Sequence, residues 1–463
     1  MNRKKREFCT YLNFDYRGVE EHLAKMAARG WRLEKVGTYF WTYRRAEPAR
    51  VTYAVTYLPD ASQFDPDPSE QQASLAELCA AAGWEKAADW GQMQIFVNER
   101  PDPVPLETDE SVRMEAIRRS MKKDFLLWNR VLLALAAVMT LLQVKTLVTD
   151  PIHLLSSNSG LITAVLWDAV VVQAAATLLT YRRWCRRSAA SVARGGPCAD
   201  PGRGLRRLNR VVLWLAVLCL AFFFVSSAAS ADGGTVLFLL CYLAVFVLVA
   251  YLVNRVRRYL QREGVSRRAN LGITLLVDVV LAVVLVGGLT GGYLALSLNG
   301  TFSGRETYTY DGREWDADPE PLPLTLEDLT GESYPHVRRS RYGSGSLLVR
   351  EDNCHDYVLD EQDHGKSLDY TVTTAALPAL GDLAAEHILM EWTDRDYYDY
   401  AETDPTPWGA EAAYRRIYDD GWDRYATDDY LLCWPDRVVE ISLTDLEPTP
   451  GQMAVIGEKL QNA

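Results

Sequence analysis

The stretch TVLFLLCYLAVFVLVAYLV, residues 235–253, decides the fold, because it contains no charged residue and is followed at once by the basic sequence NRVRR. A helix needs about 20 consecutive apolar residues to cross the hydrocarbon core of a bilayer. Four further runs of similar composition flank this one, at Phe125–Val148, Leu161–Tyr181, Val211–Ser230 and Leu271–Leu298. The sequence therefore predicts a multi-domain polytopic membrane protein, with a five-helix transmembrane bundle between two soluble regions.

Basic residues fall on alternate connections between these segments. Nine arginines lie in residues 182–210, six in residues 255–268, and four Lys or Arg in residues 118–123, whereas connections 149–160 and 231–234 contain none. Lys and Arg accumulate on cytoplasmic loops. The pattern predicts a multi-pass membrane protein with a cytoplasmic N-terminus and an extracytoplasmic C-terminus. A large soluble protein is the alternative, but its buried helices would usually be shorter and rarely apolar all round.

The net charge of −12 is distributed unevenly. Residues 1–124 carry 19 basic and 20 acidic side chains, residues 125–298 carry 17 and 6, and residues 299–463 carry 13 and 35. So acidic a C-terminal third repels nucleic acid, and we expect no direct nucleic-acid binding. It suits a cation or a basic peptide, or it serves solubility alone.

Composition divides the chain into five regions. We expect a cytoplasmic α+β domain at residues 1–105, a charged linker helix at 106–124, the membrane bundle at 125–298, a polar stalk at 299–323 and an acidic extracytoplasmic α+β domain at 324–463.

The N-terminal domain contains a doubled unit of an amphipathic helix, a Gly-Trp step and short strands. The first copy has a helix at 16–29, Gly30, Trp31 and strands at 32–36, 39–44 and 51–58. The second has a helix at 69–82, Gly83, Trp84 and strands at 85–88 and 92–98. Glycine accepts the left-handed turn that ends a helix, and we expect the tryptophan to cover the helix end. The aromatic residues of these strands form either a core or a ligand platform, and the core is the commoner use.

Two segments carry a resemblance to a known family. They are MAARGWRLEKVGTYFWTYRRAEPARVTYAVTYLPD, residues 26–60, and CAAAGWEKAADWGQMQIFVNE, residues 79–99. They resemble the bacterial family called domain of unknown function 2812, over about the first hundred residues. The resemblance implies a cytoplasmic domain followed by membrane helices, in a bacterial cell membrane. Because members are often encoded beside PadR-type transcriptional repressors, it also implies a cytoplasmic transcriptional regulator as partner, and it brings no catalytic residues.

Inside the membrane segments, two carboxylates and four glycines are the candidate functional residues. Asp168 and Asp278 lie within apolar runs, where acids usually face a bundle interior or a partner. They serve either ion transport or helix packing. Glycines four residues apart let another helix approach closely, and such pairs are formed by Gly287, Gly288, Gly291 and Gly292. They join the last helix to its own bundle or to a second copy of the chain. The basic loops also favour anionic membrane lipid.

The C-terminal domain offers weaker candidates. Strands are expected at 346–349, 370–375, 430–434 and 437–443, and helices at 381–392 and 450–462. Cys354 and Cys433 are the only cysteines placed outside, where an oxidising compartment permits a disulfide. A metal or hydrolytic site would use the histidines of this domain with a neighbouring acid, from the set His355, His364, His387, Asp356 and Asp363.

No catalytic or metal-binding motif supports such a site, and we expect no cofactor. The leading hypothesis is a non-enzymatic sensor or regulatory protein. It would link the outer acidic module to a cytoplasmic partner. The alternatives are a transporter or channel component that uses the intramembrane carboxylates, and an envelope enzyme.

Overall fold

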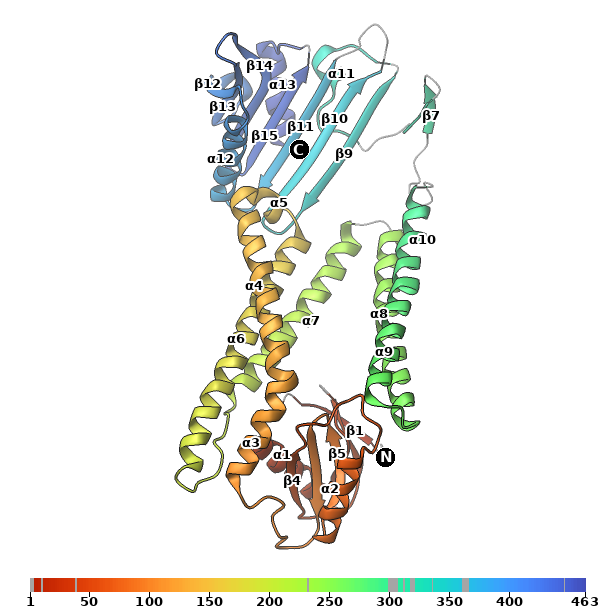
Figure 1. Cartoon of the computed structure of the whole chain (residues 1–463). Helices are drawn as coiled ribbons and strands as arrows, with labels where there is room; N and C mark the ends of the chain where they lie inside the picture. Colours follow the sequence, from red (N-terminus) through yellow and green to blue (C-terminus); the bar gives the residue numbers. More distant parts are fainter. Residues whose placement is uncertain are drawn as a thin grey trace. The chain divides into compact units, whose positions relative to one another are not determined.

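Figure 1 shows the chain as a computed structural model. The structure describes residues 4–9, 11–37, 40–230, 233–298, 307–310, 313–316, 321–334, 336–359, 366–444 and 446–463. It divides into two compact units, one of residues 1–139 and 166–299 and one of residues 140–165 and 300–463. Tyr39, Asp363, His364 and most of the expected stalk lie outside the described residues.

The N-terminal domain is built from two β-α-β-β units. The first contains β1 (Lys4–Phe8), α1 (Tyr16–Ala28), β2 (Trp31–Lys35) and β3 (Phe40–Arg45). The second contains β4 (Thr52–Tyr57), α2 (Glu70–Ala81), β5 (Glu85–Trp90) and β6 (Met93–Asn98). Their antiparallel sheets have the equivalent orders β1-β3-β2 and β4-β6-β5. Strand β1, which the sequence analysis did not predict, completes the first unit.

The Gly-Trp step is repeated in detail. Gly30 and Gly83 have φ angles of +77° and +83°, the left-handed conformation expected after a helix. Each hairpin then has an irregularity at equivalent residues, between Leu33 and Lys35 in the first and between Lys86 and Ala88 in the second. Equivalent residues of the two copies are therefore 53 positions apart in the sequence, from the end of the helix to the last strand.

The two tryptophans of the step have different surroundings. Trp84 is 3% exposed, and its indole N–H donates to the Val104 carbonyl at 2.9 Å. Trp31 is half-buried, with the Arg45 guanidinium 5.1 Å from its ring centroid. Only the second tryptophan is a core residue.

The strand aromatics mainly form the core. Trp41, Tyr43, Tyr53 and Tyr57 are each at most 5% exposed, whereas Phe40 points outward. This core continues into the helical part of the same unit, through Ile117, Met121, Tyr181, Trp184 and Leu205. The domain and the adjoining helix ends thus share one apolar core.

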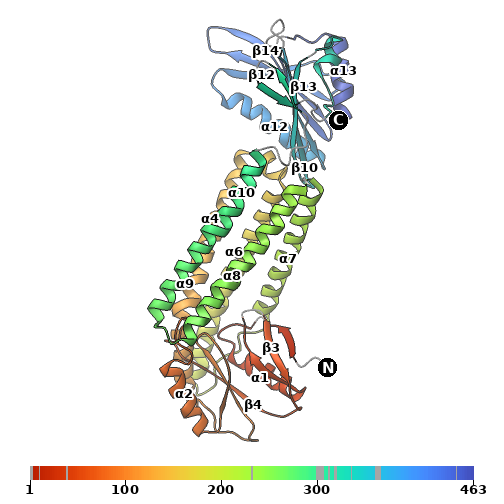
Figure 2. The ribbon, with the colours of Figure 1, turned by 90° about the vertical axis from the view of Figure 1, so that its right-hand side faces the viewer.

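Five helices are long and apolar enough to cross a membrane. They are α4 (Leu126–Thr149), α6 (Asn158–Val192), α7 (Gly204–Ser230), α8 (Gly233–Arg262) and a last helix made of α9 (Arg267–Leu281), the π-helical turn η2 (Ala282–Val286) and α10 (Gly287–Leu298). Two helical segments, α3 (Glu110–Ser120) and η1 (Met121–Phe125), lead into α4, and the short α5 (Pro151–Leu155) follows it. Helix α8 runs beside α9 and α10 in both views (Figures 1 and 2). The five-helix prediction is confirmed.

The C-terminal domain is a seven-stranded antiparallel sheet with helices on both faces. Its strands, in the order β12-β13-β14-β15-β11-β10-β9, are β9 (Val337–Gly345), β10 (Val349–Val358), β11 (Ser367–Ala375), β12 (Tyr398–Thr403), β13 (Ala412–Asp419), β14 (Arg424–Trp434) and β15 (Arg437–Thr444). The helices are α11 (Leu326–Thr330), α12 (Pro378–Asp394), the 3-10 turn η3 (Thr406–Trp408) and α13 (Pro450–Gln461). A separate pair, β7 (Thr307–Tyr310) and β8 (Arg313–Asp316), precedes them.

Alternation along the strands supplies two cores. Leu431 and Val438 pack with α12, whereas their neighbours Leu432 and Val439 pack with α11 and α13. Successive strand residues point to opposite faces, so each central strand contributes to both cores. The expected α+β fold class is confirmed.

One expected strand is wrong. Residues 346–349 form the turn between β9 and β10, where the Ser346 N–H donates to the Val349 carbonyl at 2.9 Å. Only Val349 belongs to a strand. The sequence signal was the apolar pair Leu347 and Leu348, and Leu347 is 76% exposed at the tip of the hairpin.

Replacing the glycines by alanine tests the repeat. We expect Gly83→Ala to destabilise by about 1–2 kcal/mol, the usual cost of a left-handed conformation for a residue with a Cβ. Gly30→Ala should cost more, because its Cβ would lie 2.8 Å from the Ala46 carbonyl oxygen, whereas that of Gly83 meets only the flexible Arg100 side chain. Thermal unfolding of the full chain in detergent measures both.

Gly91→Ala is the matched control, since Gly91 has φ +59° and nothing within 4 Å of the added Cβ. It should show the conformational cost alone. Equal losses for Gly30→Ala and Gly91→Ala would contradict the close approach at Gly30.

Candidate functional site

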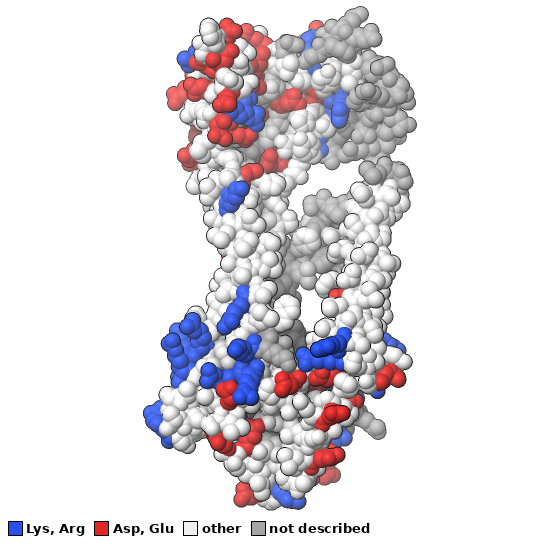
Figure 3. Space-filling view, in the orientation of Figure 1, with Lys and Arg blue, Asp and Glu red and all other residues white. Residues whose placement is uncertain are grey.

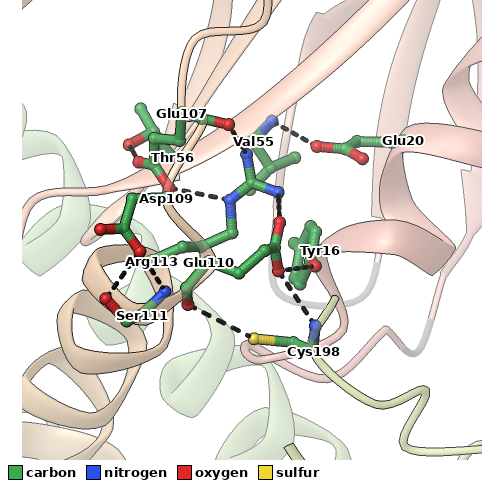
Figure 4. Close-up of polar contacts among 10 residues, drawn as sticks. All are labelled: Tyr16, Glu20, Val55, Thr56, Glu107, Asp109, Glu110, Ser111, Arg113 and Cys198. Atoms are coloured by element: carbon green, nitrogen blue, oxygen red, sulfur yellow. Dashed lines mark hydrogen bonds and ion pairs between the residues drawn. The ribbon is translucent and has the colours of Figure 1, made fainter. Parts of the chain in front are cut away.

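A polar cluster, which we call the N-terminal junction, joins the N-terminal domain to the helices of its unit (Figure 4). It combines residues of α1, β4, the segment before α3, α3 itself and the loop between α6 and α7, namely Tyr16, Thr56, Glu107, Glu110, Arg113 and Cys198.

Arg113 lies between two carboxylates. Its Nε is 2.8 Å from Glu107 Oε2 and its Nη1 is 2.8 Å from Glu110 Oε1. Glu110 Oε2 accepts two more hydrogen bonds, from the Tyr16 hydroxyl at 3.1 Å and from the Cys198 backbone N–H at 3.0 Å. The Arg113 side chain is only 13% exposed, so each of these charges needs its partners.

The hydrogen bonds hold the junction in its charged form. Burial alone would raise the pKa of Glu110, but the Cys198 N–H, Arg113 and the Tyr16 hydroxyl lower it below its ordinary value. Burial would lower the pKa of Arg113, but the bonds to Glu107 and the nearby carboxylates raise it. Both groups are therefore ionised at neutral pH.

Two further acids beside the junction have raised pKa values. Burial raises the pKa of Asp15 to about 6, although Arg206 of α7 lies 3.7 Å away and the Gly18 N–H donates to the carboxylate. Burial raises the pKa of Glu20 to about 7, although the Val55 N–H donates to its Oε1 at 2.8 Å. Both acids are poised to change charge near neutral pH.

Aromatic rings pack beside the N-terminal junction. The Phe14 ring lies 5.4 Å from that of Tyr181 and 5.3 Å from that of Trp184, both on α6. The Trp184 indole N–H donates to the Ala199 carbonyl at 2.8 Å in the α6–α7 loop. Domain, helix and loop are thereby fixed to one another.

The turn between α8 and α9 also contacts the N-terminal domain. The Asn270 side chain donates to the Phe64 carbonyl at 3.0 Å, and that of Gln261 donates to the Gln63 carbonyl at 2.7 Å. A pocket of about 940 Å³ opens here, and its basic lining residues are Lys35, Arg255, Arg257, Arg258 and Arg262. Figure 3 shows Lys and Arg gathered at the helix ends beside this domain.

The connection between α4 and α6 contacts the C-terminal domain, in what we call the C-terminal junction. Ile152 of α5 packs with Ile388 and Trp392 of α12. The Asn158 side chain donates to the Gly345 carbonyl at 3.0 Å, at the β9–β10 turn. His387 Nε2 of α12 lies 3.8 Å from Asp150 Oδ1.

An acidic groove of about 920 Å³ lies between α12 and the β12–β14 end of the sheet. Its lining includes four acids, Asp382, Glu386, Asp399 and Glu411, beside the apolar Leu389, Met390 and Trp434. No Lys or Arg occurs among the described residues that line it. Figure 3 shows Asp and Glu dominating the visible face around these elements. The groove suits a ligand with both positive charge and apolar surface.

The two intramembrane carboxylates lie on described helices. Asp168 of α6 and Asp278 of α9 both have exposed side chains on their helices. Transport by these carboxylates would need them to face an enclosed path, and this role stays a prediction.

The four glycines of α10 have an open face. Nothing described lies within 4 Å of a Cβ added at Gly287, Gly288, Gly291 or Gly292. Tyr293 stacks on Phe238 of α8 at 4.2 Å between ring centroids. At 3.6 residues per turn, Tyr293 is on the opposite side of α10 from the glycines. Close packing of the glycines within their own bundle is not observed among the described residues, and pairing with a second copy stays a prediction.

The disulfide prediction is wrong. Cys354 lies in β10 and Cys433 in β14, and both are free cysteines. Strands β11 and β15 lie between them. At about 4.8 Å per strand step, the separation far exceeds the roughly 7 Å that a disulfide can span.

One of the suggested pairings, His355 with Asp356, is also wrong. His355 Nδ1 lies 2.5 Å from Asp369 Oδ1 and its Nε2 lies 3.1 Å from the Tyr342 hydroxyl. Asp356 is buried on the other face of the strand, where it pairs with Arg339 at 3.1 Å. Adjacent residues of a strand point to opposite faces, so His355 and Asp356 cannot act on one ligand.

These features together define a protein with five candidate membrane-spanning helices and a folded domain on each side of them in the sequence. Residues 15–128 match the family model described as protein of unknown function (DUF2812), so the N-terminal segment is a DUF2812 domain. The matched residues include α3 and hence most of the N-terminal junction, but not Cys198 or Arg206. No curated protein and no solved structure matched the chain.

The junction residues were not found by sequence reasoning. The only signal was the charge of the expected linker helix, since Glu107, Glu110 and Arg113 form no recognised motif. Their partners lie up to 94 residues away along the chain.

Removing the Glu110 carboxylate should release the α6–α7 loop. Cys198 is 1% exposed, and its N–H donates to Glu110. We expect Glu110→Ala to raise the rate of maleimide labelling of Cys198 at least tenfold, measured by mass spectrometry of its peptide. Cys79, which is 3% exposed elsewhere in the domain, should keep its rate.

Glu115→Ala is the matched control, because Glu115 lies on the same helix and pairs with Arg119 at an exposed position. It should leave both labelling rates unchanged. Unaltered protection of Cys198 in Glu110→Ala would show that the loop is held by other contacts.

Glu20 should make stability depend on pH. Its folded pKa of about 7 exceeds the ordinary value of 4.5 for a glutamate, so between these values the native state keeps a proton that the unfolded state has lost. Stability from this group therefore falls as pH rises from about 5 to 7, and is constant above. Thermal midpoints of the wild type minus those of Glu20→Gln should show this slope. A flat difference would refute the raised pKa.

Proposed function

We propose that this chain is a non-enzymatic regulatory protein of a bacterial cell membrane. A cationic ligand would bind the C-terminal domain outside the cell. The helices would relay its binding to the DUF2812 domain, which would act on a cytoplasmic partner. A PadR-type transcriptional repressor is the kind of partner that the family resemblance favours.

The proposal rests on which of the connections between helices contacts which folded domain. The α6–α7 loop and the α8–α9 turn contact the DUF2812 domain, whereas the α4–α6 connection contacts the C-terminal domain. Successive connections of a polytopic protein alternate between the two sides of a membrane. The contacts follow the same alternation as the arginines, which supports a cytoplasmic DUF2812 domain.

The acidic groove supports a cationic ligand as the input. Its acids have no basic lining residue to neutralise them among the described residues. The adjacent apolar side chains would add contact area for a peptide or an amphipathic amine. Helix α12 lines the groove and also packs on α5, so a ligand in the groove touches the helix that forms the C-terminal junction.

The relay rests on continuity. Along the chain, α3 of the N-terminal junction passes through η1 into α4, and α4 ends next to α5 of the C-terminal junction. The basic pocket beside α8 would hold an anionic lipid headgroup, each basic residue contributing about 1 kcal/mol near such a surface. Membrane lipid would thus anchor the DUF2812 domain while its helices respond.

Hydrogen exchange of the full chain in nanodiscs tests the relay. A lysine-rich decapeptide should slow exchange in residues 378–394, because these line the groove. It should also change exchange in residues 107–128, because the helices transmit the movement of α12. A serine-rich decapeptide of equal length should change neither.

Two variants distinguish ligand binding at the groove from transmission to the DUF2812 domain. Glu386→Gln with Asp382→Asn should abolish both changes, because the groove loses two of its acids. Glu110→Ala should keep the first change and lose the second. A wild-type chain that binds the peptide with no change in residues 107–128 would eliminate the relay.

A further inference from the structure

Strand β1, the residue that follows it and helix α1 bring together a carboxylate, a thiol and an imidazole that the junctions do not use. Glu7, Cys9 and His22 have ligand atoms that all lie within 4.8 Å of one another. His22 Nε2 is 3.9 Å from Cys9 Sγ and 3.6 Å from Glu7 Oε1. Two separate elements thus direct three different metal-binding groups at one place.

The cluster is largely enclosed and incompletely bonded. Cys9 is 4% exposed, and the His22 side chain is 17% exposed. Glu7 Oε2 is buried without a hydrogen-bond partner, although the Lys5 ammonium lies 3.3 Å away.

The distances fit a small tetrahedral ion. Zinc takes sulfur at about 2.3 Å and nitrogen or oxygen at about 2.0–2.1 Å. A tetrahedral site therefore separates its sulfur and nitrogen ligands by about 3.5 Å, and its oxygen and nitrogen ligands by about 3.3 Å. The observed separations of 3.9 Å and 3.6 Å need only a slight closure.

The internal repeat shows that this arrangement is not required by the fold. At the register of 53 residues, His22 corresponds to Leu75 of α2, which packs with Cys79, Trp84 and Phe96 in an apolar cluster. The second copy fills the place with a leucine. The first copy instead holds polar groups at this position, and burying those costs stability unless they are satisfied.

We propose that Glu7, Cys9 and His22 form a zinc site with three protein ligands and one position left for water. Thiolate and imidazole together favour zinc over magnesium or calcium, which prefer oxygen ligands. Binding would form a Zn–S bond and release the Cys9 thiol proton to solvent. The ion would fasten β1, at the edge of its sheet, to α1.

The simpler interpretation is a structural one. The pKa of Cys9 is raised to about 12, mainly by burial. The thiol is therefore neutral and packs as a small apolar group. The Tyr43 hydroxyl lies 3.0 Å from His22 Nε2 and satisfies the imidazole. A metal titration separates the two interpretations.

Cobalt(II) chloride added to the full-length protein in detergent is the probe. We expect one equivalent per chain to give the near-ultraviolet charge-transfer band of a cobalt–thiolate bond and the visible bands of a tetrahedral ion. Zinc chloride should displace it. A titration without the charge-transfer band would overturn the proposal.

Variants assign the band to this cluster. Cys9→Ala should abolish it, whereas Glu7→Gln should keep it with an affinity at least tenfold weaker. Cys79→Ala is the matched control, because Cys79 is equally buried at 3% exposed but packs among apolar residues; it should change neither band nor affinity. Thermal unfolding without metal checks that each variant folds. An undiminished band in folded Cys9→Ala would refute the site.

Discussion

The N-terminal junction depends on one buried ion pair network. A membrane helix satisfies its own peptide groups, so the five apolar helices need nothing from the folded domains. Arg113 differs, because its guanidinium is largely removed from water and both of its carboxylate partners are in turn bonded to other segments. Burying one charge of such a pair without its partner lowers the stability of the fold by several kcal/mol. The domain, α3 and the α6–α7 loop are therefore expected to move as one body or to separate as a whole.

That all-or-none property is what a relay requires. A coupling between distant sites needs an element with two discrete arrangements, which both sites bias. The junction supplies a first arrangement whose charges are all paired. Asp15 and Glu20 lie beside it with pKa values of about 6 and 7, so a small displacement that admits water would also change their charge. In the proposed relay, movement and protonation would therefore be linked at this place.

The sequence predicts the parts of this protein whose signal is local. Apolar length identifies the five helices, and the Gly-Trp step identifies the repeat, since a left-handed glycine is needed at each helix end. Strands with polar sequences were missed: β1 reads KKREF and β9 reads VRRSRYGSG. They lie at sheet edges, where one neighbour is enough and an apolar pattern is not needed.

The long-range features could not be read from residue types alone. The incorrect disulfide between Cys354 and Cys433 illustrates why. Two cysteines in one compartment are compatible with a bridge until the strand order separates them by two intervening strands. The same holds for the Glu7, Cys9 and His22 cluster, because Cys9 and His22 have no spacing that marks a metal site. These residues come together because β1 pairs at the edge of its sheet, and the charged sequence of β1 did not predict a strand.

The two junctions also constrain what the membrane helices can be. In a protein whose helices moved a solute, the buried acids would be expected to line the path, and the folded domains could be attached loosely. Here the arrangement is reversed: the carboxylates of the apolar helices are exposed, whereas buried and bonded charges lie where the DUF2812 domain meets the helix ends. Charges are costly to bury, and this chain buries them between a domain and its helices. That distribution favours the transmission of a conformational change over the passage of an ion.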